Sequence, residues 1–173
     1  PEWPPVGPQI PAPTPVPGTG NGLIGDYYNG QDFQSFVFSR TDPSINFSWA
    51  GSPGPGVGND EFSVRWTGFL VPPTSGIYTL TLSVDDGARM WIDDRLIYDG
   101  WTYVGIPISL NEMLYAGRAH KLRFDLREYT WEARAQLSWI PPGGTVEIIP
   151  QTRLYSSLPS ATATFTPSNS PTV

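Results

Sequence analysis

Apolar and polar side chains alternate along the middle of the chain. In segment 77–84 every second residue is a large apolar one, and the residues between them are Ile, Thr, Thr and Ser. A period of two is typical of a β-strand with one buried face. The same period occurs in four further segments, 45–49, 62–66, 120–126 and 133–139. The pattern therefore predicts at least five half-buried strands.

Turn sequences separate these segments. Pro-Pro pairs occur at 72–73 and 141–142, and the stretch 51–60 is too rich in Gly and Pro for a strand, so we expect it to cross one end of the fold. Only segment 110–115 fits a helical turn. Many short strands without a long helical pattern predict an all-β protein, an antiparallel β-sandwich or barrel.

Composition divides the chain into three parts. Segment 1–21 is rich in proline, which removes amide donors and favours extended backbone, so it is interpreted as a linker. Segment 156–173 is rich in Ser, Thr and Pro and is interpreted as a second linker. The domain is expected at 22–155. Linkers on both sides favour a module of a longer protein over a single domain with frayed ends.

Charge and residue counts exclude several classes of function. The chain has no Cys, so neither disulfides nor Cys-based metal sites are expected. A net charge of -6 argues against nucleic acid as a partner. No run of eighteen apolar residues predicts a membrane span, and no signal peptide opens the sequence. If the natural protein is exported, this chain is expected to be part of a longer one.

The most distinctive polar motif is Asp85-Asp86-Gly87. Adjacent carboxylates can hold a cation, and Asp-Asp-Gly is also good hairpin chemistry, so both interpretations stand. A second pair, Asp93-Asp94, is assigned to a tight turn and to solubility. The only histidine, His120, alternates in phase with apolar residues and is interpreted as a core or strand-end residue.

No motif of a known catalyst is present. The sequence has neither a Gly-x-Ser-x-Gly elbow nor a histidine pair at metal-binding spacing. Paired carboxylates that hydrolyse glycosides depend on a separation in space, which spacing along the chain does not reveal. We expect a domain without catalytic activity.

Several motifs in order resemble the PA14 domain family. They are GLIGDYYNG at 22–30, FSVRWTGFLVPPTSGIYTLTLSVDDGARMWIDDRLIYDGW at 62–101, LYAGRAHKLRFDLREY at 114–129, AQLSW at 135–139 and the closing RLY at 153–155. The resemblance implies a barrel-like β-sandwich of the kind found in bacterial toxins, glycoside hydrolases and yeast adhesins. In glycan-binding members a cis peptide joins two aspartates that hold Ca²⁺, which in turn contacts sugar hydroxyls.

By this resemblance, Asp85 and Asp86 are the candidate Ca²⁺ ligands. Gly87 supplies a backbone that can take a positive φ and is expected to let a ligand approach closely. The sugar-binding adhesins complete the metal site with an Asn in a later loop, whereas the corresponding segment 128–132 has no Asn. Glu128 or Glu132 could supply the missing oxygen, with equal weight.

Aromatic residues near this turn are candidates for contact with sugar. Trp131 could stack on a pyranose or could plug a gap over the core. Trp101 and Tyr103 are further candidates for a rim around Asp85. Four other tryptophans lie in the predicted strands and are assigned to packing: Trp49, Trp66, Trp91 and Trp139.

Together these features predict a carbohydrate-binding module of a bacterial multidomain protein, located outside the cell or on its surface. The expected partner is a glycan, a cell-wall polysaccharide or an exopolysaccharide, bound with or without Ca²⁺, beside neighbouring domains of the same protein. The alternative is a spacer or protein-interaction module that binds no sugar, as in toxin prodomains. Linkers that provide reach suit both functions.

Overall fold

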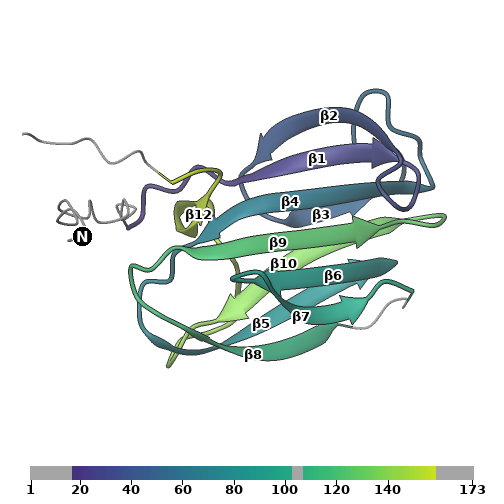
Figure 1. Cartoon of the computed structure of the whole chain (residues 1–173). Helices are drawn as coiled ribbons and strands as arrows, with labels where there is room; N and C mark the ends of the chain where they lie inside the picture. The colour runs from purple at the N-terminus through teal and green to yellow at the C-terminus, as the bar shows by residue number, and fades with distance from the viewer. Residues whose placement is uncertain (1–16, 103–106, 159–173) are drawn as a thin grey trace, which may run out of the picture.

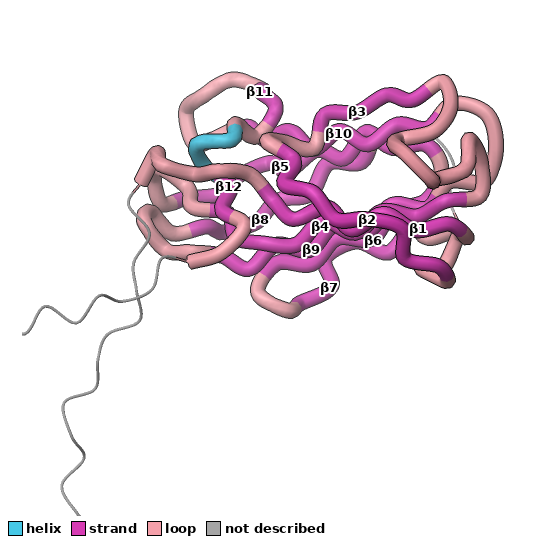
Figure 2. The backbone as a smooth tube through the Cα atoms, turned by 90° about the horizontal axis from the view of Figure 1, so that it is seen from above, coloured by secondary structure: helices cyan, strands magenta, loops and turns pink. Residues whose placement is uncertain are grey.

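Two antiparallel β-sheets pack face to face, as the computed structural model shows for residues 17–102 and 107–158 (Figures 1 and 2). The first sheet has seven strands, in the order β2-β1-β4-β9-β6-β7, and β12 also pairs with β4. Their bounds are β1 Leu23–Asn29, β2 Ser35–Asp42, β4 Phe62–Leu70, β6 Gly87–Ile92, β7 Arg95–Gly100, β9 His120–Arg127 and β12 Leu154–Tyr155.

The second sheet has five strands, in the order β11-β10-β5-β8, with β3 also paired to β10. Their bounds are β3 Asn46–Trp49, β5 Gly76–Asp85, β8 Ile108–Leu114, β10 Ala133–Ile140 and β11 Glu147–Ile148. The described chain also has one three-residue 3-10 turn, η1 Gln151–Arg153. No helix in this part of the chain is long and apolar enough to cross a membrane.

The core lies between the two sheets and uses the alternation seen in the sequence. On β5 the side chains of Tyr78, Leu80 and Leu82 are fully buried, and on β10 every second residue from Ala133 to Trp139 faces them. Full burial of one large apolar side chain contributes about 1.5–3 kcal/mol. All five predicted strands are confirmed, and the antiparallel sandwich with them.

The predicted helical turn at 110–115 is wrong, because this segment belongs to strand β8. Leu114 is fully buried and pairs with Gly76, and Leu110 pairs with Leu80. The segment 108–114 is so short that its apolar residues fit the period of a helix as well as that of a strand. Pairing with β5 favours the strand, because it satisfies backbone N–H and C=O groups of β5 that a helix would leave without partners.

The four tryptophans assigned to packing all make packing contacts, in different places. Trp66 and Trp139 lie in the core with at most 1% exposure. Trp49 stacks on Trp66, with ring centroids 6.5 Å apart. Trp91 differs, because it lies on the outer face of the seven-stranded sheet under the guanidinium of Arg123.

Candidate functional site

The motif Asp85-Asp86-Gly87 carries the chain from one sheet to the other. Strand β5 ends at Asp85 in the five-stranded sheet, and β6 begins at Gly87 in the seven-stranded sheet. The hairpin interpretation is therefore wrong, because a hairpin joins neighbouring strands of one sheet. The peptide between Asp85 and Asp86 is cis, as the resemblance to PA14 domains implies.

Gly87 has a different role from the one expected. Its φ is not positive and the residue is buried. A Cβ at this position would lie 2.2 Å from the carbonyl oxygen of Trp101. The glycine is needed because another backbone segment approaches it closely, not because a ligand does.

Asp86 and Glu128 form a buried acidic contact below the turn. Asp86 is 8% exposed, and its Oδ2 accepts a hydrogen bond from the Tyr129 amide at 2.6 Å. Burial raises the pKa of Asp86 above its ordinary value, and the charge of Asp85 raises it further, while the hydrogen bond from the Tyr129 amide acts in the opposite direction. Glu128 is fully buried. As a carboxylate it has no hydrogen-bond donor for either oxygen, and when protonated it can donate to Asp86.

The pKa of Glu128 is raised from 4.5 to about 8. Burial is the largest cause, and the negative charges of three nearby aspartates contribute to the same rise. These aspartates are Asp86, Asp85 and Asp60. The site therefore places negative charges around the carboxyl group of Glu128, and no cation of the described chain forms an ion pair with Asp85 or Asp86.

A small pocket of about 180 Å³ opens beside Asp85. Asp85 pairs in register with Arg134, and both residues line the pocket. The Nε atom of Arg134 is buried without a hydrogen-bond partner. Glu132 lies on the rim and is exposed. The other lining residues are Ser48, Trp49, Ala50 and Ala133.

Trp131 stands out from the surface next to this pocket. Its side chain is 86% exposed, which excludes the interpretation that it plugs a gap over the core. Its backbone has a φ of 86°, and its amide donates a hydrogen bond to Asp60 Oδ1 at 2.8 Å. Asp60, at the end of the Gly/Pro-rich loop, thus holds the backbone of Trp131, a contact that no local sequence signal indicated.

Trp101 is not a sugar-facing residue in this structure. It is 7% exposed, its ring stacks on Phe33 with centroids 5.6 Å apart, and its indole N–H donates to Asp32 Oδ1 at 2.8 Å. These contacts fasten the turn between β1 and β2. The prediction that Trp101 lies on a rim around Asp85 is wrong, since its ring packs against Phe33 and Arg89 and is not available to a sugar. Tyr103 lies outside the described residues.

The residues around Asp86 fit a hard cation in part. Two aspartates and a buried glutamate without a donor supply oxygen ligands of the type that Ca²⁺ prefers. Among the described residues, however, no group of three or more His, Asp or Glu side chains is arranged so that it could hold a metal ion by itself. Backbone carbonyls, water and a bound ligand would have to provide the remaining positions.

The second acidic pair, Asp93-Asp94, lies at the other end of β6. Both residues have positive φ and form the turn between β6 and β7, which confirms their assignment to a turn. His120 is 2% exposed, and its Nδ1 lies 2.9 Å from Asp93 Oδ2, which confirms its place at the start of a strand.

Comparison with known proteins agrees with this geometry. The chain is 40% identical over 143 residues to the anti-sigma-I factor RsgI3 of Acetivibrio thermocellus, which covers 81% of this chain and 22% of that protein. An anti-sigma factor domain-containing protein from Clostridium clariflavum superimposes with a TM-score of 0.76 and 32% identity over 87% of this chain and 52% of its own. The chain thus spans about a fifth of the first relative and about half of the second.

A more distant structure shares the fold. The A domain of epithelial adhesin 9 from Candida glabrata, in complex with Galβ1-3GlcNAc, has a TM-score of 0.65 at 11% identity, over 83% of this chain and 96% of its own. The profile of the PA14 domain matches residues 20–153. With the two sheets, the cis Asp85-Asp86 peptide and this match over most of its length, the chain belongs to the PA14 domain family.

Proposed function

We propose that this domain is a non-catalytic carbohydrate-binding module that binds saccharide at the Asp85 pocket. The observation that carries the proposal is Trp131, an indole that is 86% exposed and adjacent in sequence to the pocket residue Glu132. An exposed tryptophan fixed by its backbone is a ready surface for the apolar face of a pyranose, and such a contact contributes about 1 kcal/mol. A disaccharide bound to an adhesin of the same fold supports this assignment.

We further propose that Ca²⁺ takes part in this binding. Asp85 and Asp86 would hold the ion, and Glu128 would be its closest additional acidic group. When bound, Ca²⁺ supplies open coordination positions for vicinal hydroxyl oxygens. Arg134 and Glu132 then line the space in which the sugar is oriented, as a hydrogen-bond donor and an acceptor.

The sequence relatives suggest where such a module works. A relative named as an anti-sigma factor is more than four times as long as the matched region, so we propose that this domain is one part of a longer bacterial protein. Outside the cell, a module that binds a cell-wall polysaccharide or exopolysaccharide would give such a protein a sensor for glycans. Proline-rich sequence at 1–21 suits a module that needs reach.

A polysaccharide array probed with Ca²⁺ or with chelator tests the proposal. The parent domain is expected to bind at least one glycan, and Trp131→Ala to reduce its affinity about tenfold, since loss of a stacking contact and its positioning amounts to about 1.4 kcal/mol. Tyr115→Ala is the matched control, because this exposed aromatic lies beyond the end of β8 that pairs with Gly76, about 30 Å along β5 from Asp85.

A spacer or protein-interaction module is the second candidate, and one observation favours it. The outer face of the five-stranded sheet carries exposed apolar side chains, with Ile77 paired in register to Met113 and Ile140 exposed nearby on β10. Such a patch is typical of contact with another domain. An array that stays blank for the parent domain, both with Ca²⁺ and with chelator, would leave this candidate as the better one.

A further inference from the structure

A second and larger pocket lies on the outer face of the seven-stranded sheet. Its volume is about 480 Å³, and it crosses β4, β9 and β6 at the end where Asp94 forms the β6–β7 turn. The side chains that decide its chemistry are Thr67, Phe69, Trp91, Asp94, Lys121 and Arg123. We call it the outer groove. It is separate from the Asp85 pocket, which opens beside the other sheet.

The floor of the outer groove offers side chains but no free strand edge. Strand β4 is paired on one side with β1 and β12 and on the other with β9, and β9 is paired with β4 and β6. Since their backbone groups are used inside the sheet, a peptide cannot add to them as a further strand. A ligand here must be recognised through rings, hydroxyls and charges.

Arg123 is held in place by a ring and by a carboxylate. Its guanidinium lies 4.1 Å from the centroid of the Trp91 ring, and it donates two hydrogen bonds to Asp125, from Nε to Oδ1 at 3.0 Å and from Nη2 to Oδ2 at 2.5 Å. Asp125 is fully buried and also accepts two hydrogen bonds, each of 2.9 Å, from Arg65. One buried carboxylate therefore serves two guanidinium groups, those of Arg65 and Arg123.

Lys121 adds a second cation, whose ion pair with Asp94 is weak. Its side chain is 58% exposed and contacts Asp94, which is 76% exposed, at 2.9 Å. An exposed pair of this kind contributes little, so the ammonium group can exchange Asp94 for another anion at small cost. The charged residues that line the outer groove are thus two cations, Lys121 and Arg123, and one anion, Asp94.

We propose that the outer groove is a second ligand site, and that it binds an anionic saccharide through Lys121 and Arg123. The carboxylate or sulfate group of the saccharide pairs with these two cations. Phe69, half-buried on the neighbouring strand, provides an apolar ring for the sugar face, and Thr67 provides a hydroxyl. Trp91 acts as a positioning residue, since it supports the guanidinium of Arg123.

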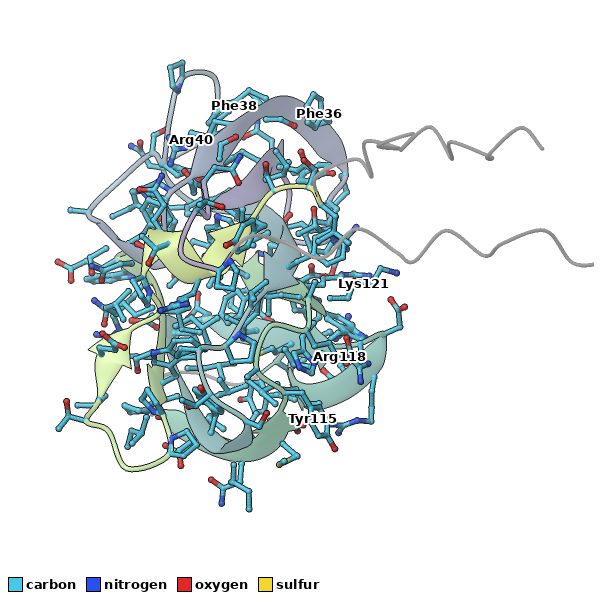
Figure 3. The ribbon with its side chains drawn as sticks, turned by 90° about the vertical axis from the view of Figure 1, so that its left-hand side faces the viewer. Phe36, Phe38, Arg40, Tyr115, Arg118 and Lys121 are labelled. Atoms are coloured by element: carbon cyan, nitrogen blue, oxygen red, sulfur yellow. The ribbon has the colours of Figure 1, made fainter. Side chains whose placement is uncertain are left out.

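Lys121 makes this proposal unusually easy to test, because it is the only lysine of the chain. Reductive methylation with ¹³C-formaldehyde labels its ammonium group and the α-amino group, and the two give separate NMR signals. Lys121 takes two methyl groups and the secondary amine of Pro1 takes one, and both groups keep their positive charge. Figure 3 shows Lys121 and Arg118 projecting from the same side of the molecule, so Arg118 is a nearby cation for comparison.

The labelled protein is titrated with a galacturonate oligosaccharide, a sulfated heparin oligosaccharide and a neutral cello-oligosaccharide. At least one anionic probe should shift the Lys121 signal in a saturable way and leave the α-amino signal unchanged. The affinity for this probe should fall as salt is added. The two anionic probes distinguish carboxylate from sulfate. An equal shift with the neutral probe, or no shift with either anionic probe, would overturn the proposal.

Matched variants separate the groove from general charge. Arg123→Gln and the unlabelled Lys121→Gln, followed by calorimetry, should each weaken binding about fivefold to tenfold, as loss of a charge-assisted hydrogen bond predicts. Arg118→Gln removes the same charge from an exposed pair outside the groove and should change affinity less than twofold. Equal effects in all three variants would contradict a defined site.

Two further arms decide between ligand classes and between sites. A polyglutamate peptide that shifts the Lys121 signal as strongly as the saccharides would show general anion binding and would overturn the saccharide assignment. Asp85→Asn should leave binding in the outer groove unchanged, since that residue lines only the other pocket. Loss of anionic binding in Asp85→Asn would place the ligand at the Asp85 pocket and refute a second site.

Discussion

Two Asp-Asp pairs flank strand β6, and the protein treats them in opposite ways. Asp93-Asp94, after the strand, is neutralised by neighbours: Asp93 contacts Arg118 at 3.0 Å and accepts the Lys121 amide at 2.9 Å. Asp93 also contacts the buried His120. The second pair therefore fastens the β6–β7 turn to the start of β9.

Asp85-Asp86, before the strand, has no ion-pair partner in the described chain. Asp86 accepts a backbone amide, and Glu128 adds a third acid in a fully buried position. The Asp-Asp dipeptide thus has a structural role at 93–94, where cations surround it. At 85–86, where other acidic groups surround it, its negative charge stays uncompensated. Uncompensated charge of this kind is enriched at functional sites, and it is the observation on which the proposed Ca²⁺ role rests.

The largest expected effect concerns Glu128. In chelator-treated protein the unfolded chain releases this proton near pH 4.5, whereas the folded protein holds it to about pH 8. The stabilisation is therefore fully present below pH 4.5 and is lost as pH rises through about 8. Because each pH unit of displacement equals about 1.4 kcal/mol, we expect a loss of a few kcal/mol, measured by urea unfolding across this range.

Glu128→Gln should remove most of this dependence, since the neutral amide can still donate to Asp86. The variant should match the parent near pH 4.5 and exceed its stability near pH 8. Glu132→Gln, at the exposed rim, is the control and should follow the parent curve. Parallel curves for all three proteins would show that Glu128 does not hold its proton.

Asp93→Ala tests the other pair and should lower the free energy of unfolding by about 2–3 kcal/mol. It leaves the buried His120 ring without its acceptor and places alanine at a φ of 50°. Asp93→Asn should recover part of the loss, because asparagine tolerates this backbone conformation and can still accept from the Lys121 amide. A change below about 0.5 kcal/mol for Asp93→Ala would argue against a structural role for the pair.

Calcium should separate the two pairs directly. At a concentration ten times its dissociation constant, Ca²⁺ bound at Asp85-Asp86 should stabilise the parent by about 1.4 kcal/mol, seen as a rise in melting temperature. Asp85→Asn and Asp86→Asn should abolish the rise, and Asp94→Asn should keep it. A rise that persists in both site variants would move the ion elsewhere.

The smallest effect is expected for Asp94→Asn, because asparagine tolerates the φ of 63° at this position. The carboxylate of Asp94 is 76% exposed and pairs only with the exposed Lys121, so the free energy of unfolding should change by about 0.5 kcal/mol or less. Urea unfolding of Asp94→Asn beside Asp93→Asn compares the carboxylate contacts of the two aspartates, since asparagine keeps the turn conformation in both. Equal losses would mean that the carboxylate contacts of Asp93 stabilise the hairpin no more than that of Asp94.

Sequence reasoning was most successful where the signal is local. Alternation predicted the core faces of β5 and β10 correctly, because a strand buries every second residue whatever its partners are. It failed at 110–115, where a short apolar segment fits two periods and only pairing with β5 decides. It also missed Asp60, which supports Trp131 from 71 residues away.

At the candidate site, the sequence by itself determined which residues carry the chemistry: two adjacent aspartates, a nearby glutamate and an indole. Tertiary structure alone decided their states. It turned an expected hairpin into a crossing between sheets, buried Glu128 and Trp101, exposed Trp131, and placed cations at Asp93 but not at Asp86. The physical reason is that burial and charge compensation depend on strands distant in sequence, whereas residue type and period are local.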